Sequence, residues 1–284
     1  MSPIIANESE INILKKLRIP AQPDVLLQLR DILQRPKVVV HDVATLIERD
    51  ASLSGGVLSV VNSPAFRRSK TITSIRDAVN LLGLQRAYTV ARTVAIRNAV
   101  DCIPGMQEFG RVTAQVAEAC VAVVRATRRH DLLDDAYLVG LFHWLGVLAM
   151  RSVFPMTYED IEQRAVVMGW SKMLPYELER WQTHHARLAA LILQDWHLAP
   201  GVVHAVDQQH AYCCAELSES IPDDAKQLLA ILKLSLHATQ GSTDIMTDNE
   251  WDHVQDCVME TLELSETAEL YATIQQAAYE AGSA

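Results

Sequence analysis

The sequence predicts an all-α protein. Of its 284 residues, 49% are hydrophobic and only 6% are aromatic, a balance that suits helix packing better than packed β-sheets. Nearly every segment places its apolar residues at helical spacing, and prolines stand where helices would begin or end. The 21% of charged residues, with 11 glycines and 10 prolines, excludes the disordered and collagen-like classes.

The first part of the chain contains four segments with helical periodicity. We expect helices over residues 24–33, 41–50, 52–62 and 74–100. Ser74 with Asp77 resembles a capping box, in which a serine side chain satisfies a backbone N–H group of the first turn. Gly55 and Gly56 lie inside a helix and favour close packing against another helix. The Pro-Gly pair within residues 101–107 marks the expected boundary of this part.

The second part continues with the same periodicity. We expect helices over residues 112–123, 137–148, 157–169, 175–192, 222–241 and 265–278, with further helices opening at 200 and 247. Pro175, Pro200 and Pro222 stand where a first-turn proline loses no hydrogen bond. We find no strand, no run of about 18 charge-free apolar residues that would span a membrane, and no secretory signal. The chain is therefore expected in the cytoplasm.

Charge is distributed unevenly along the chain. The formal net charge is −10, yet residues 1–105 carry 14 Lys and Arg against 9 Asp and Glu, whereas the remainder carries 11 against 26. We therefore predict two helical parts, a basic bundle over residues 10–105 and an acidic bundle over residues 106–284. The opposite charges of the two parts can also face each other within the chain. An acidic second part is a poor candidate for wrapping nucleic acid.

The densest basic run is Arg67, Arg68 and Lys70, in the predicted turn before Ile72. These side chains are candidates for contact with an acidic partner or a phosphate. The alternative is a solvated loop with no partner.

Motifs for nucleotide or thiol chemistry are absent. The sequence has no GxGxxG or GxxxxGK[ST] loop, and its five cysteines show no CxxC spacing. Cys213 and Cys214 lie near His210, but adjacent cysteines after a helix are expected to be structural. We predict reduced thiols and no zinc cluster or disulfide framework.

Histidine is the one residue type that suggests metal chemistry. His143 lies in the apolar run 141–146, where a polar side chain needs a partner. A histidine hydrogen-bonded within the core is the ordinary explanation. The alternative is a ligand to a divalent ion that acidifies a bound water, as helical hydrolases build from His and Asp.

Four ordered stretches resemble one family. They are Ile-Pro-Ala-Gln-Pro at 19–23, the helix from 43 that leads into residues 48–53, Leu-Ser-Val-Val-Asn-Ser-Pro at 58–64, and residues 72–84. Together they resemble the HDOD family, the regulatory relatives of the HD and HD-GYP phosphohydrolases. The resemblance continues more weakly through 140–146 and 178–210, so it covers most of residues 19–240. It implies an N-terminal helical bundle followed by an HD-like helical bundle.

The resemblance also implies that a metal site has been lost. Catalytic relatives carry an adjacent His-Asp pair in the segment like 140–146, whereas this chain has His143 followed by Trp144. An indole has no lone pair for a metal. Further positions of the family pattern fall on Val112 and near Ser235, which are not metal ligands. His185 and His210 match other histidines of the pattern, and with His143 they are the residual candidates.

We therefore expect a non-catalytic bacterial signal-transduction output or adaptor module, without a cofactor, that binds a signalling or regulatory protein. A cyclic dinucleotide ligand is compatible with the family, but nothing in the sequence supports it. One alternative is a metal-dependent phosphohydrolase that uses His143, His185 and His210 with a carboxylate such as Asp207. Another is nucleic-acid binding through the basic run at 67–70.

Overall fold

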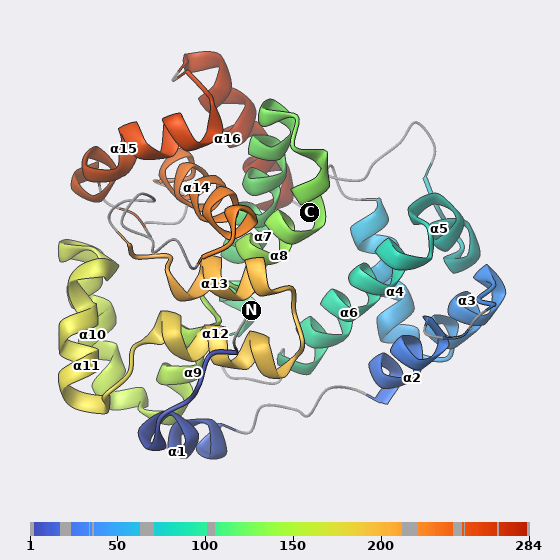
Figure 1. The fold of residues 1–284 in the computed structure, drawn as a ribbon, viewed down its shortest axis with the longest axis horizontal. Helices are drawn as coiled ribbons and strands as arrows, with labels where there is room; N and C mark the ends of the chain where they lie inside the picture. Colours follow the sequence, from blue (N-terminus) through green and yellow to red (C-terminus); the bar gives the residue numbers. More distant parts are fainter. Residues whose placement is uncertain are drawn as a thin grey trace. The chain divides into compact units, whose positions relative to one another are not determined.

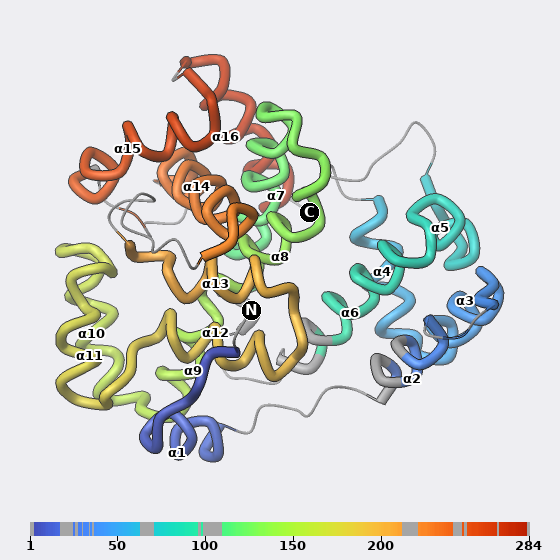
Figure 2. The backbone as a smooth tube through the Cα atoms, in the orientation of Figure 1, coloured from blue at the N-terminus to red at the C-terminus, as the bar shows by residue number. Residues whose placement is uncertain are grey.

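The computed structural model describes residues 3–17, 24–33, 35, 37–62, 71–100, 106–211, 221–240, 246, 248–265 and 267–282. All regular elements among these residues are helical, which confirms the predicted all-α class. The chain divides into two compact units (Figures 1 and 2). Unit 1 combines Met1–Arg18 with Gln107–Ala284, and unit 2 is Ile19–Met106. Residues 10–18, which we predicted within the first bundle, thus belong to unit 1.

Unit 2 is a bundle of α2 (Asp24–Leu33), α3 (Val40–Glu48), α4 (Ala51–Val61), α5 (Ile75–Leu82) and α6 (Leu84–Val100). Helix α6 contacts each of the other four. The apolar stripes that predicted these helices supply the buried core, which includes Leu29, Val43, Ile47, Leu53 and Val79. Burial of such side chains is the main favourable term in folding.

Two sequence features of unit 2 act as expected and two do not. The hydroxyl of Ser74 accepts a hydrogen bond from the Asp77 backbone N–H at 3.1 Å, which confirms the predicted cap. A Cβ atom at Gly56 would overlap the Val94 side chain, so this glycine permits close packing of α4 on α6, whereas Gly55 faces open space. The predicted 74–100 helix is wrong, because Gly83 adopts a φ of +77° and separates α5 from α6.

Unit 1 contains the remaining helices. They are α1 (Glu8–Lys16), α7 (Met106–Thr127), η1 (His130–Leu132), α8 (Leu133–Phe142), α9 (Leu145–Val153), α10 (Pro155–Met168), η2 (Trp170–Met173), α11 (Leu174–Trp181), α12 (His185–Asp195), α13 (Pro200–Asp207), α14 (Asp223–Ala238), α15 (Asp248–Leu262) and α16 (Ala268–Gly282). Helix α13 contacts α8, α12 and α14, and α12 also packs along α9. These helices bury apolar side chains on several sides, as expected for the centre of a unit.

Two helices that periodicity predicts as continuous are broken. The predicted 137–148 helix ends at Phe142 and resumes at Leu145, and the predicted 175–192 helix stops at Trp181 and resumes at His185. Gln182 adopts a left-handed conformation, and the His184 ring accepts a hydrogen bond from the Arg187 backbone N–H as the cap of α12. Both breaks lie next to histidines. Helix α1 is an element that we did not predict.

Residues 130–153 include an 18-residue window that is apolar enough for a membrane span by length and composition. However, 78% of that window is buried inside the structure, and the stretch is divided into η1, α8 and α9. Buried core helices of globular proteins can be as long and as apolar as a membrane-spanning helix.

Candidate functional site

His143 is a core histidine at the end of α8. Its ring is fully buried, and Nδ1 lies 2.7 Å from the Gly140 carbonyl oxygen, so Nδ1 carries the proton and donates. Nε2 has no hydrogen-bond partner among the described residues. The His143 carbonyl, freed by the break after α8, accepts from Gln209 Nε2 at 2.9 Å. Burial lowers the pKa of His143 to about 4, so the ring is neutral at physiological pH.

A hydrogen-bonded chain runs from α10 through α11 and α12 to His210, in the turn after α13. The buried Glu177 carboxylate accepts from the Tyr158 hydroxyl at 2.5 Å, from the His185 backbone N–H at 3.1 Å and from His185 Nδ1 at 2.8 Å. His185 Nε2 then lies 2.7 Å from Nε2 of His210. The carboxylate places a proton on Nδ1 of His185, so the two Nε2 atoms share a single hydrogen bond with each other.

The pKa values along this chain follow from burial and from charge. Burial alone would raise the pKa of Glu177, but His185 and the Tyr158 hydroxyl lower it overall. Burial, His185 and Lys233 together hold the pKa of His210 well below its ordinary value. Burial and the Glu177 charge raise the pKa of Tyr158, so its hydroxyl keeps its proton and donates. Glu177 is therefore ionised and His210 is neutral near pH 7.

A pocket lies on the far side of His210. Its cavity volume is only about 30 Å³, and it is lined by Trp144, Ser171, Gln209, His210, Ala211, Lys233, Leu236, Met246, Glu250 and Val254. The buried Lys233 ammonium donates to the Gln209 carbonyl at 3.0 Å. The Glu250 carboxylate accepts from the hydroxyl and the backbone N–H of Ser171 at 2.6 and 3.1 Å. Lys233 and Glu250 are thus charged groups of the pocket lining that are already hydrogen-bonded to neighbouring residues.

The structure separates the predicted site residues. It brings His185 and His210 together and places His143 close enough to affect the pKa of His210. Asp207 instead bonds to Gln208 and Arg187, on the side of α12 that faces α1. Ser235 bonds to the Ile231 carbonyl of its own helix. The predicted partner-binding residues Arg67, Arg68 and Lys70 lie outside the described residues.

Sequence reasoning missed Glu177 and Lys233. Both are charged residues within the buried stripe of a helix: Glu177 lies four residues before the buried Trp181, and Lys233 lies between Leu232 and Leu234 of α14. A charge among core residues must be paired, so this pattern was a usable signal.

A family model described as the HDOD domain matches residues 19–212. The chain belongs to the HDOD family. The expected family is therefore confirmed, and α1 lies outside the matched stretch.

Solved structures share the fold of this HDOD chain. A protein from Shewanella amazonensis with a provisional phosphohydrolase description has a TM-score of 0.71 at 21% identity, with 97% of each chain covered. An HDOD domain protein of unknown function from Geobacter sulfurreducens has a TM-score of 0.67 at 18% identity, covering 97% of this chain and 95% of that chain. At these identities the likeness shows the fold alone.

Among curated proteins, the cyclic di-GMP phosphodiesterase CdgJ of Vibrio cholerae is 26% identical over 145 residues, which cover 51% of this chain and 33% of CdgJ. The HDOD chain thus spans roughly a third of the length of the curated relatives it matches.

The free energy of unfolding is expected to fall as the pH drops from 6.5 towards 4. The native His143 ring, with a pKa of about 4, stays neutral while the unfolded ring takes up a proton. Because the unfolded state binds more protons in this window, stability that is fully present above pH 6.5 is lost as the pH falls, by about 3 kcal/mol for His143.

Urea unfolding at pH 7, 6 and 5 measures this loss. His143→Gln, which cannot titrate, should make the pH dependence shallower by the share of His143, while His210, whose pKa burial also lowers, still contributes. The same change at the exposed His253 should leave the dependence unaltered. Equal slopes for wild type and His143→Gln would contradict the assignment.

Proposed function

We propose that this HDOD chain is a non-catalytic signalling module that acts by binding another protein. The observation that carries the proposal is the make-up of the pocket beside His210, where an indole and a buried ammonium stand among the lining groups. The HD phosphohydrolases to which the family is related need a divalent ion at their His-Asp pair. A similar site in this chain would need donor groups that fit such an ion.

The donor set fits a divalent ion poorly. Trp144, which follows His143, lines the pocket and offers no lone pair. His185 and His210 direct their Nε2 atoms at each other, and the Glu177 carboxylate is engaged on the opposite nitrogen of His185. Among the described residues, no group of three His, Cys, Asp or Glu side chains is arranged to hold a metal ion.

Electrostatics argue in the same direction. The Lys233 ammonium lines the same pocket as His210 and already disfavours a second positive charge on that ring. Like charges in a partly desolvated pocket repel strongly, and a divalent ion doubles the effect. We therefore derive no metal-dependent step for this chain.

A signalling role is supported by the family and by the name of the Vibrio cholerae relative, a cyclic di-GMP phosphodiesterase. A signalling module without a catalytic step of its own would act by association with another protein. A regulatory protein is the partner that such a module would bind.

Metal analysis and turnover assays test the catalytic half of this proposal. We expect purified wild-type protein to contain Mn, Fe and Zn at well below one equivalent, and to leave bis-p-nitrophenyl phosphate and cyclic di-GMP uncleaved. A stoichiometric metal that disappears in His143→Ala, together with turnover, would establish the phosphohydrolase alternative instead.

Affinity capture tests the binding half. Wild type and His143→Gln should capture the same protein from the source cell at a stoichiometric ratio. The double variant Arg67→Glu, Arg68→Glu tests the basic run as the interface and should fail to capture that protein. Capture of nucleic acid with steep salt dependence would contradict a protein partner.

Removal of the pocket ammonium should make the site more hospitable to a cation. We expect Lys233→Met to raise the affinity for Zn²⁺, which imidazoles favour, by at least about tenfold in isothermal titration calorimetry. The exposed Lys172 provides the matched control, and Lys172→Met should bind Zn²⁺ as wild type does. Unchanged affinity in Lys233→Met would show that the ammonium does not exclude the ion.

A further inference from the structure

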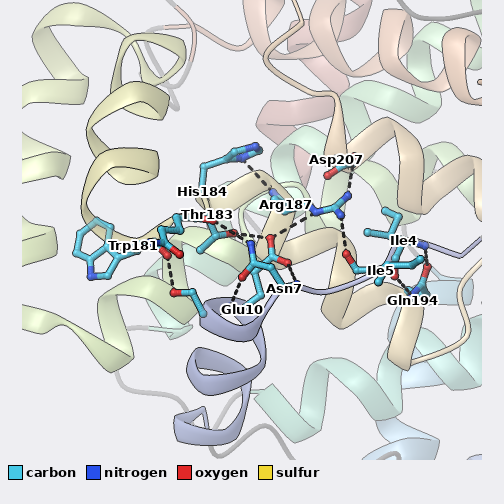
Figure 3. A network of polar contacts seen from close by, with 12 residues as sticks. Ile4, Ile5, Asn7, Glu10, Trp181, Thr183, His184, Arg187, Gln194 and Asp207 are labelled. Carbon is cyan, nitrogen blue, oxygen red and sulfur yellow. Dashed lines mark hydrogen bonds and ion pairs between the residues drawn. The ribbon is translucent and has the colours of Figure 1, made fainter.

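Residues 3–17 lie on α11 and α12 in the manner of a bound peptide. They pack with unit 1, although unit 2 follows them in the chain, and they precede the stretch that matches the family. Figure 3 shows the polar network: the extended residues before α1 cross α12, and the first turn of α1 meets the turn that joins α11 to α12.

The extended part is held through its main chain. The Gln194 side-chain amide bonds to Ile4 twice, with Oε1 accepting from the backbone N–H at 2.6 Å and Nε2 donating to the carbonyl at 2.9 Å. Arg187 donates to the Ile5 carbonyl at 3.1 Å. The Ile5 side chain is 83% exposed, so this position is held without regard to its side chain. Such contacts are typical of extended peptide recognition.

The first turn of α1 is held through side chains. Asn7 Nδ2 donates to the Gln182 carbonyl at 3.0 Å, and Ser9 donates to the Trp181 carbonyl at 2.6 Å. These carbonyls end α11 and have no partner within their own helix, so Asn7 and Ser9 satisfy them. Asn7 also caps α1 by accepting from the Glu10 backbone N–H.

Glu10 provides the charged contact. Its carboxylate is buried and accepts from the Asn7 backbone N–H at 2.7 Å and from the Thr183 hydroxyl at 2.9 Å, with Arg187 Nε at 3.5 Å. Arg187 also lies 3.5 Å from Asp207, so it links α1 to α13. A carboxylate buried in this way requires these partners; the turn before α12 supplies Thr183 and α12 supplies Arg187.

Two apolar side chains of the segment are buried as well. Ile13 and Leu17, four residues apart on one face of the segment, are 3% and 7% exposed. The segment therefore has three features of a specifically bound peptide. Its main chain is hydrogen-bonded at Ile4 and Ile5, the side chains of Asn7, Ser9 and Glu10 make polar contacts, and two apolar side chains are buried.

We propose that this face of α11 and α12 is a binding site for the pattern Asn-x-Ser-Glu followed by apolar residues at the positions of Ile13 and Leu17, and that the same segment of a second copy binds there in trans. The segment in cis, which the chain joins to the rest of unit 1 through unit 2, competes for this site as an intramolecular ligand. An isolated helix this short is marginal in water, so a free peptide must fold as it binds. Displacement of the cis segment is thus the step that controls binding in trans.

A fluorescent peptide of residues 3–17, titrated against full-length chains in an anisotropy assay, tests the site. The Glu10→Ala chain, whose own segment is weakened, should bind the peptide at least about tenfold more tightly than wild type. Adding Arg187→Ala to that chain should abolish binding, and the peptide that carries Glu10→Ala should bind at least about tenfold more weakly. Arg164→Ala, which removes an exposed ion pair with Asp160 on α10, should leave the affinity unchanged.

Equal peptide affinity for the wild-type and Glu10→Ala chains, or indifference to Arg187, would overturn the proposal. Circular dichroism establishes that each chain is folded. If the Glu10→Ala chain is not folded, Ser9→Ala weakens the cis segment more mildly and replaces it.

A mixture of full-length Glu10→Ala and Arg187→Ala chains combines one intact site with one intact segment. Native mass spectrometry should detect a dimer in the mixture and not in either chain alone, and peptide binding without this dimer would overturn the second-copy assignment.

Discussion

Replacement of Glu177 by alanine is expected to lower the free energy of unfolding by about 3–5 kcal/mol, because three buried hydrogen-bond donors would lose their acceptor. The carboxylate accepts from Tyr158, from the His185 backbone and from the His185 ring. All these donors are buried, so water cannot replace the lost oxygen atoms without rearrangement. His185 would also lose the group that orients its ring towards His210.

Urea unfolding followed by circular dichroism measures the loss. Glu179→Ala is the matched control, because Glu179 lies on the exposed face of the same helix. Glu177→Gln, which keeps one acceptor oxygen and the shape of the side chain, should cost less than Glu177→Ala. A loss below 1 kcal/mol in Glu177→Ala would show that the carboxylate is not an organising group.

Gly146→Ala is expected to cost about 3 kcal/mol or more, or to prevent unit 1 from folding. A Cβ atom at Gly146 would overlap the His185 carbonyl and press on the Ala189 backbone N–H group. Because the obstacle is backbone, no side-chain rotation can relieve it, and α9 must move away from α12. This movement would also displace His185 from Glu177 and His210.

Thermal unfolding by circular dichroism checks this prediction, with Gly55→Ala as the control. Gly55 lies inside α4 with nothing near the added atom, so alanine there should stabilise the protein by about 0.5–1 kcal/mol. If both substitutions were neutral, the contact between α9 and α12 would be looser than the structure describes.

Much of the fold could be predicted from the sequence, because helical spacing is a local property. The stripes over 24–33 and 52–62 correspond closely to α2 and α4, and Ser74 caps α5 as expected. The sequence analysis did not predict where helices are interrupted, and it did not predict α1. Periodicity runs through Gly83 and His143, but it does not record where the chain turns.

The candidate site was harder to predict. His185 and His210 were expected from the family resemblance, and they do form a direct hydrogen bond. Glu177 and Lys233 were missed, although a charge within a buried stripe is visible in the sequence. Their partners are not visible, because Lys233 bonds to Gln209, 24 residues away in the chain, and no spacing rule relates the two.

The sequence by itself determined that this protein is helical, where most helices lie and which histidines are candidate site residues. Only the tertiary structure decided that two helices break beside those histidines, that Glu177 orients His185, and that residues 3–17 bind α11 and α12. Helix formation depends on neighbours three or four residues apart, whereas the contact of Ile4 with Gln194 joins positions 190 residues apart. Such contacts exist only once the packing of many helices has brought the two positions together.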